Sequence, residues 1–253
     1  RWAGGVLRGD LGLSMMMDRP IGPLIKDAIL RSAVLAGFSI VLVAVIGIWL
    51  GVYSAVRKGS AADHAVSLGM YFFISVPEFF WAIVVILLFA GYLGWFPATG
   101  YASLSEGFWI WLQHIVLPVA TLVSGLVAHI ARLTRSSMIE TLQSQYVTAA
   151  RAKGLPENIV IRRHALRNAL VPTITVLAID IGMLMGGIVV VETVFSYPGL
   201  GRMLIFAIEQ KDIPVIQAGI LTVTAVYAFA NLAADLLYAF FNPRIRYGNA
   251  VAR

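Results

Sequence analysis

The sequence predicts an all-α polytopic membrane protein, because its composition and its long apolar runs point the same way. Of its 253 residues, 59% are hydrophobic and 13% are charged, whereas soluble domains have about 45–50% apolar and about 25% charged residues. So few charged side chains could not cover a soluble core. Five stretches contain the roughly 20 mostly apolar residues that cross a bilayer as a helix: about 32–56, 66–95, 110–133, 170–195 and 214–241.

The five stretches are too long for transmembrane strands, which alternate in segments of about ten residues. The first stretch is uninterrupted, and Gly47-x3-Gly51 places two small residues on one helix face for close packing. Pro77 interrupts the second stretch and predicts a kink. Pro118 stands near the start of the third, and Pro172 marks the entry into the fourth. The fourth also carries Gly182-x3-Gly186, a second small-residue pattern.

Several classes of site and activity are excluded by what the sequence lacks. It has no cysteine, which excludes disulfides, thiol catalysis and Cys-based zinc sites. The four histidines show no metal-binding spacing, so we expect no metal site. ATP hydrolysis by a P-loop needs Gly-x4-Gly-Lys-[Ser/Thr], and no Gly-Lys pair occurs. A nucleic-acid partner is disfavoured, because the basic residues flank membrane spans instead of forming a soluble patch.

The distribution of Lys and Arg predicts the orientation, since cytoplasmic loops carry the excess. One set of loops has twelve basic and three acidic residues, and the opposite set has seven basic and six acidic. The first set is therefore expected to be cytoplasmic, with the C-terminus inside and residues 1–31 outside. About 30 residues then precede the first span outside the membrane with no signal peptide to export them. We expect a missing upstream span, hence six spans in the intact protein; a five-span protein with an external tail is the alternative.

The cytoplasmic segment 134–169 is the largest block outside the membrane. Residues 136–153 read as a helix, Gly154 suits a left-handed C-cap, and Pro156 prevents continuation. Pro156 also suits the first turn of a second helix, about 156–170, which carries basic and apolar residues. Such a helix–turn–helix element could enter a groove on a partner, or it could be an ordinary solvated loop.

Two runs in this segment, Tyr146 to Leu155 (YVTAARAKGL) and His164 to Pro172 (HALRNALVP), resemble the signature loop of binding-protein-dependent ABC permeases of the oligopeptide/dipeptide/nickel import family. Thr148 stands where the general signature has Glu, and the distance from Gly154 to Pro172 is longer; both departures resemble the peptide branch. Further matches occur at 9–14 (GDLGLS), 189–201 (VVVETVF, then PGLG) and 231–247, where Asn242 replaces a more usual Asp. The resemblance covers residues 4–248.

The resemblance implies a type I ABC importer transmembrane domain over residues 32–253, with six spans when intact. It implies a second permease subunit that is a paralogue, two ATP-binding subunits below, and a periplasmic or lipid-anchored solute-binding protein above. This chain would bind no cofactor, since ATP and Mg²⁺ would sit on partner subunits. The signature loop would dock on an ATP-binding subunit through Tyr146, Ala149, Ala150, Arg151, Lys153, Gly154, Leu155 and His164. In that interface Ala149 and Ala150 would allow close approach, and Arg151 and Lys153 could pair with acidic groups.

Acidic residues within or at the ends of spans are a second group of candidates, because a charge in the bilayer usually faces protein or a water-filled cavity. Asn231 and Asp235 lie four residues apart, on one helix face. These groups either line a polar translocation path or hydrogen-bond neighbouring helices, and the second interpretation is favoured for those near span ends. The candidates are Glu78, Asp180, Glu192, Asn231 and Asp235.

The function predicted from these observations is the non-enzymatic permease subunit of an ABC importer for peptides or a related small polar solute. We expect it in the cytoplasmic (inner) membrane of a bacterium or archaeon, in contact with membrane lipid. The alternative is a proton-coupled secondary transporter that uses the intramembrane acids as a relay. Segment 196–212, on the expected outer side, could form a short helix that touches the binding protein, or an ordinary connector.

Overall fold

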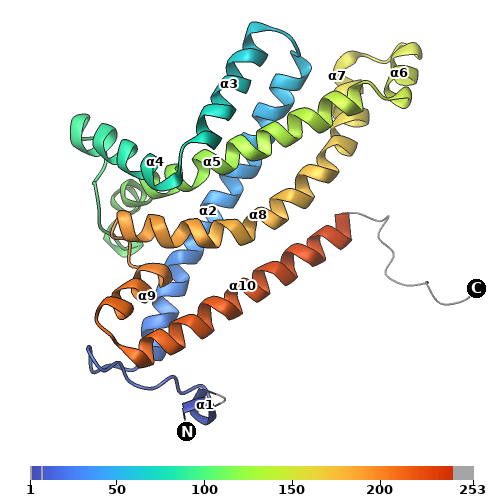
Figure 1. Ribbon diagram of the computed structural model, residues 1–253. Helices are drawn as coiled ribbons and strands as arrows, with labels where there is room; N and C mark the ends of the chain where they lie inside the picture. Colours follow the sequence, from blue (N-terminus) through green and yellow to red (C-terminus); the bar gives the residue numbers. More distant parts are fainter. Residues whose placement is uncertain (1, 7, 242–253) are drawn as a thin grey trace, which may run out of the picture. The chain divides into compact units, whose positions relative to one another are not determined.

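The computed structural model describes residues 2–6 and 8–241, without the side chains of 2, 3, 234, 235 and 237–241. Its regular elements are helices (Figure 1), as the sequence predicts. In chain order they are α1 (Trp2–Val6), α2 (Ile21–Val56), α3 (Ala61–Ser75), α4 (Glu78–Val85), η1 (Ile86–Tyr92), η2 (Leu104–Glu106), α5 (Phe108–Leu142), α6 (Gln145–Ala152), α7 (Glu157–Ile159), η3 (Val160–Ala165), α8 (Leu166–Val194), α9 (Leu200–Glu209) and α10 (Ile213–Phe241).

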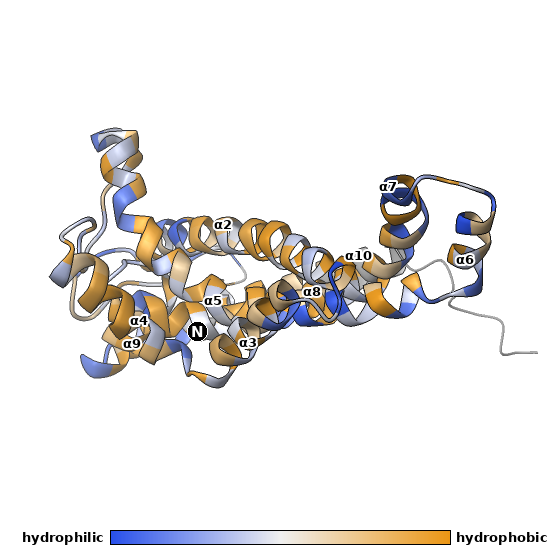
Figure 2. Cartoon of the chain, turned by 90° about the horizontal axis from the view of Figure 1, so that it is seen from above, coloured by the Kyte–Doolittle hydropathy of each residue, from blue (hydrophilic) through white to orange (hydrophobic). Residues whose placement is uncertain are grey.

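The five predicted spans are confirmed as helices of suitable length and hydropathy. Four segments qualify singly, namely 21–56, 108–142, 157–194 and 213–233, and the broken pair α3 and α4–η1 makes a fifth if it counts as one span. Apolar colour runs along most of α2 in Figure 2. This helix begins at Ile21 and not near residue 32, because Lys26, Asp27 and Arg31 interrupt the apolar run without interrupting the helix. Lys and Arg are good helix formers.

Pro77 breaks the second span, as predicted. Its ψ of 145° lies outside the helical range, and its carbonyl accepts the first hydrogen bonds of α4, from the N–H groups of Phe80 and Trp81 at 3.0 and 3.2 Å. Pro172, in contrast, lies inside α8, so the helix predicted over about 156–170 continues into the fourth span without a break there. Prolines are tolerated within membrane helices because neighbouring groups can satisfy the freed carbonyl.

The predicted helix over residues 136–153 is two helices. α5 runs to Leu142, and α6 starts at Gln145. Ser144 separates them, because its backbone is extended (ψ 152°) and its hydroxyl donates to the carbonyl of Thr141 at 2.6 Å. A serine side chain that bonds to a nearby carbonyl in this way competes with the regular helical ladder.

The chain forms two compact units. Within the described residues, the first consists of residues 2–6, 8–41, 76–124 and 183–229, and the second of residues 42–75, 125–182 and 230–241. The first unit has a buried cluster formed by Ile21 and Ile25 of α2, Ala207 of α9, and Val215 and Ala218 of α10. In the second unit, Met70 of α3 packs with Ala128 and Ala131 of α5.

Gly47 and Gly51, the small residues noted in the first apolar stretch, allow α2 to pack closely on α5 in the second unit. A Cβ added at Gly47 would lie 2.8 Å from Cγ2 of Ile130, and one at Gly51 would lie 2.6 Å from the carbonyl oxygen of Ala131. Gly186 has open space around it, so the second small-residue pattern does not make such a contact there.

We predict that Gly51→Ala lowers the stability of the protein by about 1–3 kcal/mol, since overpacking forces side chains or backbone to move. Thermal denaturation in detergent, followed by size-exclusion chromatography, measures the loss. Gly37→Ala on the same helix is the matched control, because a Cβ there meets nothing within 4 Å. Equal melting temperatures for the two variants would contradict the packing role.

Candidate functional site

Segment 143–165 is held against the ends of three long helices in the second unit. Figure 1 shows α6 and α7 beyond the end of α5 and the start of α8. The buried side chains that fix it come from α2, α5, α6, η3 and α8: Ala55, Met138, Val147, Ala150, Val160, Ala165 and Ala169. The segment is therefore a packed part of the second unit and not a loose loop.

Gly154 makes the turn between α6 and α7, in the conformation predicted for it. Its φ is +76°, a value that costs residues with a Cβ roughly 1–2 kcal/mol. The N–H of Gly154 donates to the carbonyl of Arg151 at 2.9 Å, and the N–H of Leu155 donates to that of Ala150 at 3.4 Å. This pair of bonds is a Schellman motif, and Leu155 packs against the buried cluster beneath it.

Arg151 closes the same turn. Its Nε and Nη2 donate to Oε2 and Oε1 of Glu157 at 3.0 and 2.6 Å, and its Nη1 donates to the carbonyl of Leu142 at 3.2 Å. The hydrogen bond with Glu157 raises the pKa of Arg151. Arg151, for which we expected an acidic group on a partner, thus also joins the two sides of this turn within the chain.

The outward face of the segment mixes apolar and basic groups. The side chains of Tyr146 and Ile159 are 44% and 40% exposed, and Ala149 and Lys153 are also exposed. Ala150 is buried beneath them, so only Ala149 of the predicted pair is accessible to a partner. His164 is half-buried. The Tyr146 hydroxyl accepts a hydrogen bond from Nδ2 of Asn168 at 2.9 Å, which joins α6 to α8.

An ion pair between the buried Asp63 and the half-buried Arg135 ties α2, α3 and α5 together next to this segment. Asp63 is 1% exposed. Arg135 donates to it from Nε and Nη2 at 2.7 and 2.8 Å, Gly59 donates its N–H at 2.9 Å, and the Ser54 hydroxyl donates as well. Such a two-pronged guanidinium–carboxylate contact fixes both position and angle.

Sequence reasoning missed this ion pair, although it identified both charges as loop residues. One local signal was present: Ser60-x-x-Asp63 precedes an apolar run, which is typical of a helix start. The Ser60 hydroxyl does accept the N–H of Asp63 at 3.2 Å. The carboxylate, however, is used for Arg135, 72 positions along the chain.

Glu192 accepts hydrogen bonds from the start of α9 in the first unit. It is fully buried and accepts hydrogen bonds from the hydroxyl of Ser32 and from the N–H groups of Gly201 and Arg202, the latter two at 2.8 and 3.2 Å. A carboxylate is stabilised at a helix N-terminus by these free N–H groups. A Cβ at Gly199 would collide with the carboxylate, which accounts for glycine in the Pro-Gly-Leu-Gly turn. Glu192 is thus a structural group and not an open path residue.

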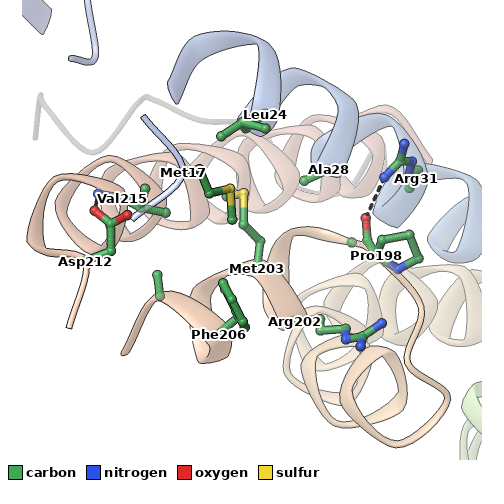
Figure 3. A pocket seen from close by; sticks show the side chains of 12 residues that line it. Met17, Leu24, Ala28, Arg31, Pro198, Arg202, Met203, Phe206, Asp212 and Val215 are labelled. Carbon is green, nitrogen blue, oxygen red and sulfur yellow. Dashed lines mark hydrogen bonds between the residues drawn. The ribbon is translucent and has the colours of Figure 1, made fainter. Parts of the chain in front are cut away.

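Asp212 holds the segment before α2 against the start of α10. Its carboxylate accepts hydrogen bonds from the Ser14 hydroxyl at 2.5 Å and from three backbone N–H groups at 3.3 to 3.4 Å, those of Met15, Met16 and Val215. Burial alone would raise the pKa of Asp212, but these hydrogen bonds outweigh it and lower the pKa. An apolar pocket of about 320 Å³ lies beside it (Figure 3).

Two intramembrane acids remain without a full set of donors. Asp180 is 3% exposed; His129 Nδ1 lies 3.1 Å from its Oδ2, while its Oδ1 has no partner in the described part of the chain. The half-buried carboxylate of Glu78 faces Gly187, where an added Cβ would lie 2.6 Å from Oε2. Asn231 is half-buried on α10, and the side chain of Asp235 lies outside the described residues.

The fold defined by these helices is that of ABC transporter membrane subunits. The chain matches a subunit in inward-facing structures of the MetNI methionine ABC transporter, with a TM-score of 0.72 over 89% of this chain and 100% of that one at 18% identity. It also matches one from an amino acid ABC transporter crystallised with histidines, with a TM-score of 0.60 over 97% and 99% at 17% identity.

Residues 47–247 match the family described as binding-protein-dependent transport system inner membrane component, and the chain belongs to that family. It is 37% identical to a probable peptide ABC transporter permease of Sinorhizobium fredii, over 97% of this chain and 79% of that one. It is 36% identical to the AppB oligopeptide permease of Bacillus subtilis (98% and 79%) and 38% identical to the GsiC glutathione permease of Pectobacterium atrosepticum (96% and 76%).

Family membership settles several predictions made from the sequence. The protein is a multi-pass inner-membrane permease of a binding-protein-dependent ABC importer, and it is the non-catalytic membrane subunit. ATP is bound by separate subunits, and a solute-binding protein delivers the solute. The proton-coupled secondary transporter considered above is thereby set aside.

We predict that Asp63→Asn destabilises the protein by about 1–3 kcal/mol, because it weakens several hydrogen bonds to a buried group. Arg135→Lys should cost less, since it keeps the charge but loses the planar fork. Thermal denaturation of the assembled importer measures both effects. Glu140→Gln is the control, an exposed acid on α5; a melting temperature for Asp63→Asn no lower than that of the control would refute the prediction.

A second prediction concerns pH. The pKa of Asp212 lies below its usual value of about 3.9, so the stabilisation by its carboxylate is complete above about pH 4 and is lost as the pH falls below that. Hydrogen-exchange protection factors of the Met15 and Met16 amides should therefore stay constant from pH 8 to about pH 5. Asp212→Ala should abolish this protection at neutral pH, whereas Glu209→Ala, which removes an exposed acid of α9, should retain it. Unchanged protection in Asp212→Ala would disprove the clamp.

Proposed function

We propose that this permease moves peptides, or a closely related small polar solute such as glutathione, across the membrane. The support is the extent of similarity: relatives named for peptide, oligopeptide and glutathione transport share 36–38% identity over nearly the whole chain. Thr148, which resembles the peptide branch, lies with Gly154 in segment 143–165, which is called the signature segment below.

The orientation proposed for the subunit follows the charge distribution. The loops with twelve basic residues, including segment 143–165 and the C-terminus, lie in the cytoplasm. The segment before α2, helix α9 and the turn at Asp212 then lie outside. On that side, the exposed methionines Met15 (73%), Met16 (56%) and Met17 (40%) offer adaptable apolar contacts for the solute-binding protein.

The signature segment is proposed to couple ATP hydrolysis to transport. The observation that carries this proposal is the construction of the segment: it is packed on the ends of α2, α5 and α8, and it presents Tyr146, Ala149, Lys153 and Ile159 outward. A short helix with one face packed and the other exposed fits a groove on a partner. Gly154, Leu155 and Arg151 maintain its shape, and His164 lies at its base. A motion imposed on this face would be passed to the helix ends beneath it.

For the translocation path we propose Glu78 and Asp180, the two intramembrane acids whose carboxylates are not fully used within their own unit. Asn231 and Asp235 remain candidates as a polar pair on α10. The second permease subunit is proposed to be a paralogue, and the spans of this chain are proposed to form a type I importer arrangement.

Gly154→Asp tests the coupling role. The substitution forces a residue with a Cβ into φ +76°, and we expect solute uptake to fall to background while membrane insertion and assembly with the partner subunits stay normal. Uptake of labelled peptide into proteoliposomes, with immunodetection of the assembled subunits, measures both quantities.

Gly94→Asp is the matched control, because Gly94 also has a positive φ (+63°) and open space but belongs to the connector after η1. Its uptake should equal that of the unmodified protein. Normal uptake by Gly154→Asp would remove the coupling role from this turn, and the family assignment would be unaffected.

A further inference from the structure

A second pocket, of about 250 Å³, lies in the second unit between the end of α2 and the α7–η3 segment. Trp49, Tyr53 and Val56 line it from α2, and Arg57 lines it from the turn that follows α2. Asn158 and Arg162 line it from the other side. None of the residues assigned above to the outward coupling face or to the translocation path lines this pocket.

The pocket combines an apolar wall with two cations. Trp49 is 62% exposed and Val56 is 42% exposed, so a bare apolar surface runs along α2 toward its end. Arg57 follows directly after α2, and its guanidinium carbon lies 4.0 Å from the centre of the Tyr53 ring. Trp49 stacks on that ring at a centroid distance of 5.4 Å. The aromatic pair therefore fixes one cation at the boundary of the apolar wall.

The two arginines of this pocket differ from the neighbouring arginines in whether they pair with an acidic residue. Arg135 and Arg151 each hold a carboxylate of their own unit, Asp63 and Glu157 respectively. Among the residues that the structure describes, no carboxylate pairs with Arg57 or with Arg162. Two exposed guanidiniums without an acid, both lining one pocket, fit a phosphate group, which they can grip with several parallel hydrogen bonds.

We propose that this pocket binds one anionic phospholipid, with its phosphate between Arg57 and Arg162 and the start of its acyl chains along Trp49 and Val56. The position supports a lipid: α2 ends at Val56 as a membrane span, and Trp and Tyr are typical of the level where headgroups meet hydrocarbon. Basic pockets between membrane helices on the cytoplasmic side suit anionic headgroups. A soluble phosphate compound would leave the exposed apolar wall uncovered.

The bound lipid would link two parts of the second unit that the coupling role depends on. Arg57 belongs to the α2–α3 turn, and Arg162 belongs to η3, which is packed in the same cluster as α6. The lipid site itself does not require that the coupling role is correct, and its test uses a binding measurement.

Native mass spectrometry of the assembled importer tests the proposal. The complex, in neutral detergent, is mixed with equal amounts of phosphatidylglycerol and phosphatidylcholine that carry the same acyl chains. We expect retention of phosphatidylglycerol to exceed that of phosphatidylcholine by about tenfold or more, as two arginines near an anionic headgroup imply. The double variant Arg57→Gln/Arg162→Gln should lose this preference. If that variant fails to assemble, Arg162→Gln alone should lose part of it.

Arg163→Gln is the matched control, since Arg163 is an exposed neighbour that does not line the pocket. It should retain the preference. Millimolar inorganic phosphate should not displace the lipid. The proposal is overturned if the double variant and Arg163→Gln retain equal amounts of phosphatidylglycerol, or if inorganic phosphate competes, which would indicate a site for soluble anions.

A fluorescence measurement adds an independent readout. Phosphatidylglycerol brominated near the headgroup should quench part of the tryptophan emission, and Trp49→Phe should remove that part. Quenching that is the same in Trp49→Phe would place the lipid elsewhere and contradict the proposed pose.

Discussion

A carboxylate removed from water needs hydrogen-bond donors. Three acidic residues of this protein obtain them from residues at or near helix ends, which they thereby hold together. Asp63 takes Arg135, Ser54 and a loop N–H; Glu192 takes Ser32 and the first N–H groups of α9; Asp212 takes Ser14 and backbone N–H groups on both sides of it. In each case a serine hydroxyl completes the set. An unpaired buried charge would cost several kcal/mol, so each acid constrains the elements that supply its donors.

These constraints describe how the proposed coupling segment would act on the spans. Ser54 and Arg135 hold Asp63, while their near neighbours Ala55 and Met138 form the cluster under α6. The same ends of α2 and α5 thus pack against segment 143–165 and hydrogen-bond to α3. Because packed interiors are stiff, a displacement of α6 cannot be absorbed at its base and would reach α3, the first half of the broken span. A loop that hung free from its helices would have no such effect.

The sequence was sufficient where the signal was local. Long apolar runs predicted the five spans, Pro77 predicted a break, and Gly154 followed by Pro156 predicted the turn of the signature segment. The start of α2 was misplaced because charged residues end an apolar run but not a helix. The break at Ser144 was missed because it depends on which carbonyl a serine hydroxyl bonds. The donors of Asp63 and Glu192 could not be predicted, since Arg135 and Ser32 lie 72 and 160 positions away and only the fold brings them together.

The same comparison separates two kinds of acid that look alike in sequence. Glu192 and Asp180 both lie in α8, yet Glu192 has donors for both oxygens, whereas Oδ1 of Asp180 has none in the described part of the chain. Leaving a buried acceptor unsatisfied costs roughly 1–3 kcal/mol. The structure avoids this cost at Glu192 but not at Asp180. Asp180 is 3% exposed and its Oδ1 is buried, so a donor from outside the subunit could reach this oxygen only if the surrounding helices moved. A role of Asp180 in the proposed translocation path therefore requires such a movement.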